Sequence, residues 1–173
     1  MEISNKHYIC KDIDSKTANI FIKKYHYSGK VVSNSKLHLG LFRGGVLLGV
    51  LSFGYPVNAK RTPNNIVAGS TYNSMYELNR MAMHDDEPKF SESKAIGLCM
   101  KWIKRYHKHI DYILSYSDGK EGNIGTIYQA TGWDYLGYMI SDSFWELDNI
   151  IMHNVQVWHK FKEEIGRASC RER

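Results

Sequence analysis

"MYELNRMAM" (residues 75–83), "SESKAIGLCMKWIKRYHKH" (91–109) and "DYILSYS" (111–117) decide the fold of this chain. The first segment alternates along its length and the third is a short apolar run, so both predict strands. The middle segment repeats apolar residues at helical spacing and predicts an amphipathic helix. A strand, a helix and a second strand in this order predict a parallel crossover.

The side-chain periods of these segments predict which residues face the core. A strand places alternate residues on opposite faces. We therefore expect two sets in the first strand: Tyr76, Leu78, Arg80 and Ala82 on one face, and Glu77, Asn79 and Met81 on the other. For the helix we expect an inward stripe of Ile96, Cys99, Met100 and Ile103, with Tyr106 as a further candidate.

The flanking segments predict an antiparallel start to the sheet. Residues 36–42 and 46–54 surround Gly44 and Gly45, which is typical of a hairpin. Before them we expect a strand at 7–13 and a helix capped by Ser15, with Ala18, Phe21, Ile22 and Tyr25 on one face. Further predictions are a long polar loop at 55–74, a short helix at 125–130 and a strand pair at 133–140 and 143–147. The order predicts an α/β fold of mixed α+β character, a central mixed sheet flanked by helices.

Length and composition fit one domain. The chain has 173 residues, of which 43% are hydrophobic, and we expect a single domain over residues 1–164. Residues 165–173, "IGRASCRER", look like a translated sequencing adapter, so we expect a non-native tail and a truncated carboxyl end. A net charge of +5 favours a polyanionic partner such as nucleic acid, at about even odds against binding nothing anionic.

Membrane spans, signal peptides and paired cysteines are the sequence features that indicate the compartment of a protein. No apolar run approaches the roughly 20 residues of a membrane span, and the amino terminus does not follow the pattern of a signal peptide. Cys10, Cys99 and Cys170 are widely spaced, so neither a disulfide framework nor a metal site is predicted. These features predict a cytoplasmic protein without a membrane partner.

The start of the long helix is a candidate anion site. Free N–H groups at a helix start bind phosphate or carboxylate, and Ser93 and Arg80 could add a hydroxyl and a charged fork. The alternatives are that Ser91 or Ser93 is only an N-cap and that Arg80 pairs with a glutamate.

A second candidate lies after the second crossover strand. Asp118 sits where a strand ends, the edge at which open α/β sheets bind ligands, and Tyr128 lies one turn into the next helix. A tyrosine there could protonate a leaving group. The alternatives are that Asp118 forms a turn before a glycine and that Tyr128 only packs.

Aromatic and basic residues provide candidates for binding a base. His26 ends the first helix between Tyr25 and Tyr27, where it could be a base, a stacking neighbour or a metal ligand; otherwise it is a cation at a helix end. The long loop carries further stacking and phosphate candidates, which are Tyr55, Tyr72, Tyr76, Lys60 and Arg61.

Five motifs follow one another between residues 25 and 137: "YHYSGK", "GVLLGVLSFGYP", "YELNRMAM", "SESKAIGLCMKWI" and "LSYSDGKEGNIGTIYQATGWDYLG". In this order they resemble the motifs of the Mom family of phage DNA-modification proteins. The resemblance implies a GCN5-related acyltransferase (GNAT) fold. It also implies transfer of a carbamoylmethyl, glycine-derived group to the exocyclic amine of adenine in DNA, which protects the DNA from restriction.

The resemblance also implies roles for individual residues. It implies that Asp118 and Tyr128 are the catalytic pair, that His26 with Tyr27 forms an amino-terminal patch, and that Arg80 and Ser93 bind the donor. The family's aspartate is commonly followed by a turn containing proline or histidine, whereas here the turn is "DGKEGNIG". The target adenine would have to flip out of double-stranded DNA.

The donor and the function class have alternatives. The implied donor is an activated acyl group, either a coenzyme A thioester or an aminoacyl-tRNA, with iron bound by His26 and Asp118 as a further option. Another function is a generic GNAT N-acetyltransferase on a small amine or protein. Such enzymes carry a pyrophosphate loop of the form Q/R-x-x-G-x-G/A before the long helix, where this chain has "HDDEPKFSESK". A non-catalytic DNA-binding module would instead need a basic helix.

Overall fold

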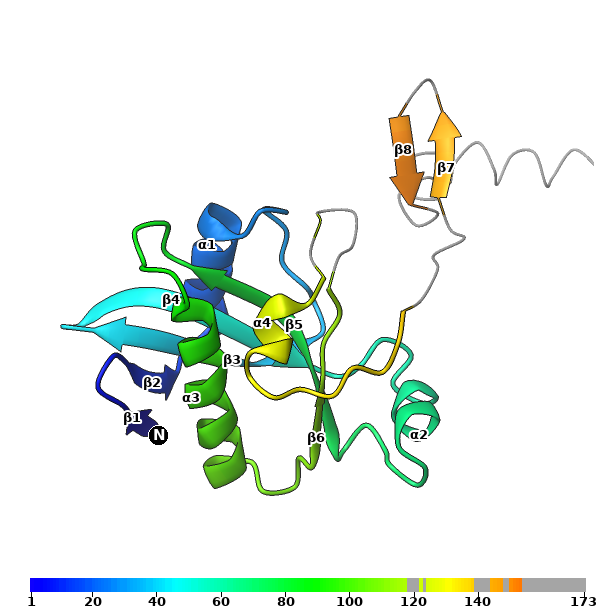
Figure 1. Cartoon of the computed structure of the whole chain (residues 1–173), viewed down its shortest axis with the longest axis horizontal. Helices are drawn as coiled ribbons and strands as arrows, with labels where there is room; N and C mark the ends of the chain where they lie inside the picture. The colour runs from blue at the N-terminus through cyan, green and yellow to red at the C-terminus, as the bar shows by residue number, and fades with distance from the viewer. Residues whose placement is uncertain (118–121, 123, 139–143, 148–149, 154–173) are drawn as a thin grey trace, which may run out of the picture. The chain divides into compact units, whose positions relative to one another are not determined.

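The computed structural model describes residues 1–117, 122, 124–138, 144–147 and 150–153. The chain divides into two compact units, Met1–Asp134 and Tyr135–Arg173, which are described separately. In the described part of the first unit, one sheet of six strands carries helices on both faces (Figure 1). The predicted mixed α/β architecture is thus confirmed.

The sheet follows the order of the chain. Its strands are β1 (Glu2–Ser4), β2 (Ile9–Asp12), β3 (Ser35–Arg43), β4 (Val46–Gly54), β5 (Met75–Met83) and β6 (Tyr112–Leu114). Each of the first five pairs antiparallel with the next, except that β5 pairs parallel with β6. The hairpin, the strand at 75–83 and the parallel crossover are as predicted, and β1 is an addition.

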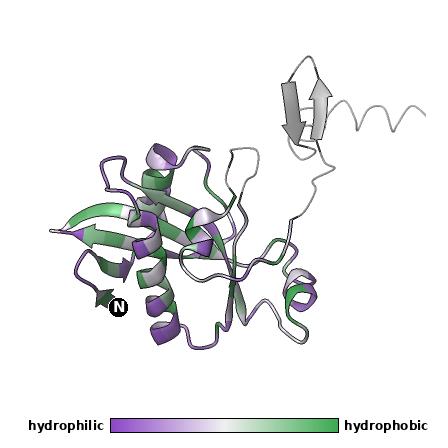
Figure 2. Cartoon of the chain, viewed as in Figure 1, coloured by the Kyte–Doolittle hydropathy of each residue, from purple (hydrophilic) through white to green (hydrophobic). Residues whose placement is uncertain are grey.

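Two long helices cover opposite faces of the sheet, as Figure 1 shows for α1 (Ser15–Tyr25) and α3 (Ser91–Tyr106). α3 packs on the larger cluster, whose members include Leu39, Leu51, Phe53, Leu78 and Trp102. α1 packs on a smaller cluster made of Ala18, Phe21, Ile22, Val50 and Ala82. In Figure 2 the exposed side of α3 is hydrophilic, as expected for an amphipathic helix.

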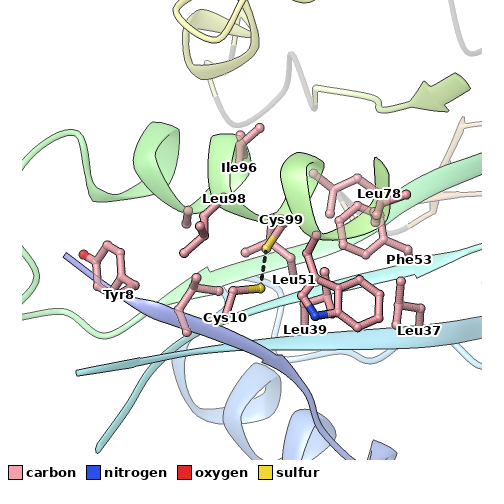
Figure 3. Packing of buried hydrophobic residues seen from close by; sticks show 14 of the residues in the cluster. Tyr8, Cys10, Leu37, Leu39, Leu51, Phe53, Leu78, Ile96, Leu98 and Cys99 are labelled. Carbon is pink, nitrogen blue, oxygen red and sulfur yellow. Dashed lines mark hydrogen bonds between the residues drawn. The ribbon is translucent and has the colours of Figure 1, made fainter. Parts of the chain in front are cut away.

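The core between β2 and α3 contains two thiols. Figure 3 shows Cys10 on β2 facing Cys99 on α3, with their Sγ atoms 3.8 Å apart. Both are fully buried free cysteines, whereas Cys170 lies outside the described residues. Burial raises the pKa of the Cys99 thiol, so it stays protonated and packs like a small apolar side chain.

Local expectations differ from the structure at two caps. The side chain of Asp14, rather than that of Ser15, accepts the N–H of Thr17 and caps α1. Ser91 and Ser93 both lie inside α3, whose N-cap is Phe90 with φ 69°. The serine hydroxyls instead donate backwards, from Ser91 to the carbonyl of Pro88 and from Ser93 to that of Phe90.

The remaining differences lie in loops and at the end of the chain. The predicted long loop contains a one-turn helix, α2 (Thr62–Ile66), with Pro63 in its first turn. The short helix α4 (Thr126–Gln129) is as predicted. In the second unit, β7 (Phe144–Leu147) pairs with β8 (Ile150–His153). The expected strand at 133–140 does not form over its described residues, where Gly137 has φ 110°. The suspected tail at 165–173 lies outside the described residues.

Candidate active site

The two strands of the crossover separate and leave a cavity beside β5. β5 has nine residues, but β6 pairs only with its first three, Met75–Glu77. The rest of β5 therefore has no strand partner on this side within the described residues. A cavity of about 590 Å³ lies there, lined by residues 78–83, 25–27, 116–117, 124–128 and the start of α3. Strand ends of this kind are where α/β sheets bind ligands.

A β-bulge shapes the wall of the cavity. Ser52 of β4 pairs with Arg80, whereas the next residue, Phe53, pairs with Leu78, so Asn79 is an extra residue in β5. The bulge is held by side chains, because Asn79 accepts the Ser35 hydroxyl at 3.1 Å and donates to Glu77 at 3.3 Å. Such a bulge bends the strand and redirects its side chains.

The bulge corrects the predicted faces of β5. Tyr76 and Leu78 pack in the larger core under α3, whereas Ala82 packs under α1. Met81, expected opposite Leu78, contacts the same α3-side core. The alternation reverses at Asn79 because the bulge inserts one residue into a period of two.

Arg80 lies in the cavity wall with its guanidinium on backbone carbonyls. Its Nε donates to the carbonyl of Lys30 at 3.0 Å and its Nη1 to the carbonyl of Asn79 at 2.7 Å. The alternative of a pair with Glu77 or Glu92 is not seen, since no ion pair of Arg80 is present among the described residues. Arg80 thus fixes the turn after α1 against the bulge.

His26 is held as a neutral ring. It ends α1 and stacks on Tyr27, with ring centroids 4.3 Å apart. Its Nδ1 accepts the N–H of Ser28 at 3.1 Å. Burial, followed by the positive charge of Arg80, lowers the pKa of His26 to about 4. Because Nδ1 is an acceptor, the ring proton lies on Nε2.

Tyr128 reaches the cavity from α4. Its oxygen accepts the Ser115 hydroxyl at 2.8 Å, which leaves its own O–H free to donate. Burial is the main cause that raises the pKa of Tyr128, so it stays protonated at neutral pH. The ring packs on Trp133, with centroids 5.1 Å apart, and this contact fixes its direction.

The structure brings most of the predicted site residues together. The cavity is lined by five of them: Tyr25, His26, Tyr27, Arg80 and Tyr128. Three others are not among its lining residues, namely Ser93, Lys60 and Arg61. Asp118 lies outside the described residues. The start of α3 and the segment after β6 were predicted from the sequence as two separate sites. In the structure both border one cavity.

The aromatic candidates differ in exposure. Tyr27 is 65% exposed and Tyr72 is 42% exposed, so both rings can meet a ligand. Tyr72 packs edge-on against Tyr55, with centroids 5.4 Å apart. Tyr76 is 7% exposed and its hydroxyl bonds to His107, so it belongs to the core rather than to a stacking surface.

Three supporting residues were not predicted from the sequence. Ser28 fixes the His26 tautomer, Ser115 orients Tyr128 and Asn79 forms the bulge. The sequence signal for the bulge was the group of polar residues Glu77, Asn79 and Arg80 inside a mostly apolar strand. The serines have no such signal, because their partners are set by loop geometry.

Neither a metal centre nor a membrane span is found within the described residues. There, no group of three or more His, Cys, Asp or Glu side chains is placed to hold a metal ion. No helix in that part is long and apolar enough to cross a membrane.

Solved structures show the same fold. Aminoglycoside N-acetyltransferase AAC(6')-Iy, in a complex with CoA, matches with a TM-score of 0.54 at 12% identity, over 79% of this chain and 94% of that one. A possible acetyltransferase from Clostridium difficile 630 matches with a TM-score of 0.54 at 10% identity, over 84% and 99% of the two chains. These likenesses establish a GNAT fold.

Sequence comparison identifies the family. Residues 7–172 match the Mom protein family. The protein named "Methylcarbamoylase mom" from Escherichia phage Mu is 38% identical over 138 residues, which are 80% of this chain and 56% of that protein. The chain thus spans little more than half the length of this relative. The chain belongs to the Mom protein family and has the fold of the GNAT acetyltransferases.

Proposed function

We propose that this protein is a DNA-modifying transferase, which attaches a carbamoylmethyl group, derived from glycine, to the exocyclic amine of adenine and so protects DNA from restriction. The observation that carries the proposal is the single cavity lined by His26, Tyr27, Arg80 and Tyr128, which come from three separate parts of the chain. The family match and the name of the phage Mu relative support the reaction class.

Tyr128 is the proposed proton donor. In the transfer step the adenine nitrogen bonds to the carbonyl carbon of a glycyl thioester and the carbon–sulfur bond breaks. One proton leaves the amine and one joins the sulfur of the leaving group. Tyr128 suits the second of these proton transfers, because its O–H is free and its raised pKa keeps it protonated. The glycyl amide formed is an isomer of the carbamoylmethyl amine: its free amine adds to C6 of adenine, the bond from C6 to the original nitrogen breaks, and one proton moves from the attacking to the departing nitrogen.

Asp118 is the proposed acceptor of the amine proton. This role rests on the resemblance of "SYSDGKEGNIGTIYQ" to the Mom motif and on the position of residues 116–117, just before Asp118, in the cavity wall. His26 contributes as a donor rather than as a base, since its Nε2–H can bond to a ring nitrogen or carbonyl oxygen of a reactant.

DNA would approach from the exposed aromatic and basic residues. A flipped base costs a few kcal/mol of stacking, which aromatic rings in the protein can offset. Tyr27 beside His26 is the exposed ring in the cavity wall. Lys60 and Arg61 are exposed before α2 and suit phosphates of double-stranded DNA. The reaction would take place in the cytoplasm of the host cell.

The proposed donor is an activated acyl compound of the thioester class. The aminoglycoside acetyltransferase of the same fold is a complex with CoA, which supports this class. The iron option rested on His26 and Asp118, and the described residues offer no cluster in its favour. An aminoacyl-tRNA donor has no supporting observation among the comparisons.

Nucleoside analysis of DNA tests the proposal. The whole chain is expressed in bacteria, and their DNA is digested and separated by chromatography with mass spectrometry. A glycyl amide has the same composition as a carbamoylmethyl amine, so mild base is used to separate them: it hydrolyses the amide and leaves the alkylated amine intact. We expect base-stable modified deoxyadenosine. Unmodified adenine in cells that contain the folded protein would contradict the proposal.

Matched variants assign the chemistry to the cavity. Asp118→Asn and Tyr128→Phe should remove the modified nucleoside without changing the amount of folded protein. Tyr112→Phe is the control, because Tyr112 is exposed at the start of β6 and does not line the cavity. Modified adenine at normal levels in both cavity variants would remove the assignment.

A further inference from the structure

The turn between β5 and α3 uses up most of its N–H groups. Among residues 84–91, the N–H groups of His84, Asp86, Glu87 and Ser91 all donate within the protein, and Pro88 has none. Of these eight residues only Asp85, Lys89 and Phe90 therefore keep an N–H for a ligand, and the first turn of α3 adds those of Glu92 and Ser93. A site that cradles a phosphate needs several such groups pointing at one spot.

Carboxylates, rather than cations, extend from this turn to the cavity. Asp85, Glu87 and Glu92 all line the cavity, whereas the neighbouring Lys89 and Lys94 do not. A carboxylate in the first turn of a helix occupies the positive end of the helix dipole. Glu92 is in that position in α3, so its negative charge opposes an anionic ligand at this helix start.

The arginines near the turn are already engaged. Arg43 forms an ion pair with Glu87, whose side chain is 4% exposed and which also accepts the Tyr8 hydroxyl. Arg80 donates to the carbonyls of Lys30 and Asn79. A diphosphate at the start of α3 would compete with Glu87 for Arg43, and it would meet Asp85 and Glu92, which form no ion pair among the described residues.

The N-cap residue of α3 also differs from the glycine of a pyrophosphate loop. Phe90 has φ 69°, a backbone conformation that favours glycine, yet its aromatic side chain is 74% exposed there. The pyrophosphate loop of the form Q/R-x-x-G-x-G/A has glycines, which let phosphate approach the backbone. Here the sequence has none from residue 84 to residue 93. The residues present do not fit the diphosphate of coenzyme A.

We propose that the acyl donor of this protein is recognised without a diphosphate, and that the part of the donor beside the start of α3 is neutral or cationic. The inference deepens the proposed function and rests on it. The acyl end of the donor would still bind beside the bulge and Tyr128, where the Tyr128 hydroxyl is free to donate a hydrogen bond. Recognition at the α3 end would then select against anionic groups by repulsion.

Binding of a graded series tests the proposal. Calorimetry with the whole protein compares acetyl-pantetheine, acetyl-phosphopantetheine and acetyl-CoA, which share the thioester and differ in phosphate content. We expect dissociation constants within about threefold, or weaker binding as phosphate is added. An increase in affinity of more than about tenfold from the first compound to the last, reversed by salt, would overturn the inference.

Charge variants provide an independent measurement. Asp85→Asn combined with Glu92→Gln should strengthen binding of acetyl-CoA by severalfold and leave acetyl-pantetheine unchanged. Asp111→Asn is the control for a change of surface charge, since Asp111 is exposed and outside the cavity. If the double variant and Asp111→Asn changed the affinity for acetyl-CoA and for acetyl-pantetheine equally, a local repulsion at the start of α3 would be contradicted.

The two proposals fail in distinguishable ways. If acetyl-CoA does not bind while modified adenine appears in cells, the donor is of another class and the inference is supported. A phosphate-independent series without modified adenine overturns the proposed function alone. Steep phosphate dependence together with modified adenine overturns the inference alone.

Discussion

The Nδ1 atom of His26 accepts the backbone N–H of Ser28 at a distance of 3.1 Å. A ring held in this way cannot gain a second proton on Nδ1 without losing the bond and placing two N–H groups head to head. The contact, the burial of the ring and the charge of Arg80 therefore all favour the neutral form.

We predict that His26 stays neutral at pH 5 and titrates near pH 4. The unfolded ring binds a proton near pH 6.5 and the folded ring only at about 4, so the unfolded state binds more protons between these values. Stability due to this group is complete above pH 6.5 and falls as the pH drops towards 4. NMR titration of the ring nitrogens gives the pKa directly, and a value near 6.5 would contradict the geometry.

A variant without the ring tests how much His26 contributes to the pH dependence of stability. His26→Gln removes the titrating ring, so denaturant unfolding should show less loss of stability from pH 6.5 to pH 4.5 than in the unchanged protein. Comparison of the two slopes is needed because burial also lowers the pKa of His38 and His107. Identical slopes would show that His26 does not contribute.

Tyr128→Phe should abolish modification at little cost in stability. The ring contact with Trp133 survives the change, and one hydrogen bond from Ser115 is lost, which costs about 0.5–1.5 kcal/mol. Loss of a general acid lowers the rate by about 10²–10⁴-fold. Modified deoxyadenosine per cell and urea unfolding of the purified protein are the two measurements.

Ser115→Ala separates proton donation from orientation. This variant keeps the Tyr128 hydroxyl but removes the group that directs it, so we expect a smaller loss of modification than for Tyr128→Phe. An equal loss in both variants would mean that the Ser115 contact, rather than the Tyr128 proton, sets the rate.

The regular elements could be predicted because their hydrophobic periods are long. β5 begins and ends where the alternation of "MYELNRMAM" does, and α3 begins at Ser91 as its apolar stripe indicates. The periods determine element type and core side, which suffices for a mixed sheet with a parallel crossover. The family motifs then named four of the residues that border the cavity, His26, Tyr27, Arg80 and Tyr128.

The details of the site could not be predicted, because they depend on contacts distant in sequence. The bulge at Asn79 reverses the faces of β5, and it is held by Ser35, which lies 44 residues away. The turn before α3 looks only acidic in sequence. The sequence does not show that the turn is closed by a hydrogen bond from the N–H of Glu87 to the His84 carbonyl, which takes this N–H away from any ligand.

Substitution of glycine by alanine should have opposite effects on stability at Gly54 and at Gly97. A Cβ at Gly54 would lie 2.4 Å from the Asn34 carbonyl oxygen and 2.6 Å from Oδ1 of Asn79, so Gly54→Ala should destabilise the fold and disturb the bulge. Gly97 lies within α3, and a methyl group added there would meet nothing within 4 Å, so Gly97→Ala should stabilise the fold by about 0.5–1 kcal/mol. Urea unfolding measures both; equal shifts would contradict the packing at Gly54.

The buried thiols of Cys10 and Cys99 should be unreactive in the folded protein. Both side chains are fully buried between β2 and α3, and the raised pKa of Cys99 keeps the thiolate scarce (Figure 3). In a Cys170→Ser background, a thiol reagent should label them only as fast as the protein unfolds, and both together once urea is added. Rapid labelling of either cysteine in native buffer would show that the contact between β2 and α3 opens locally, without global unfolding.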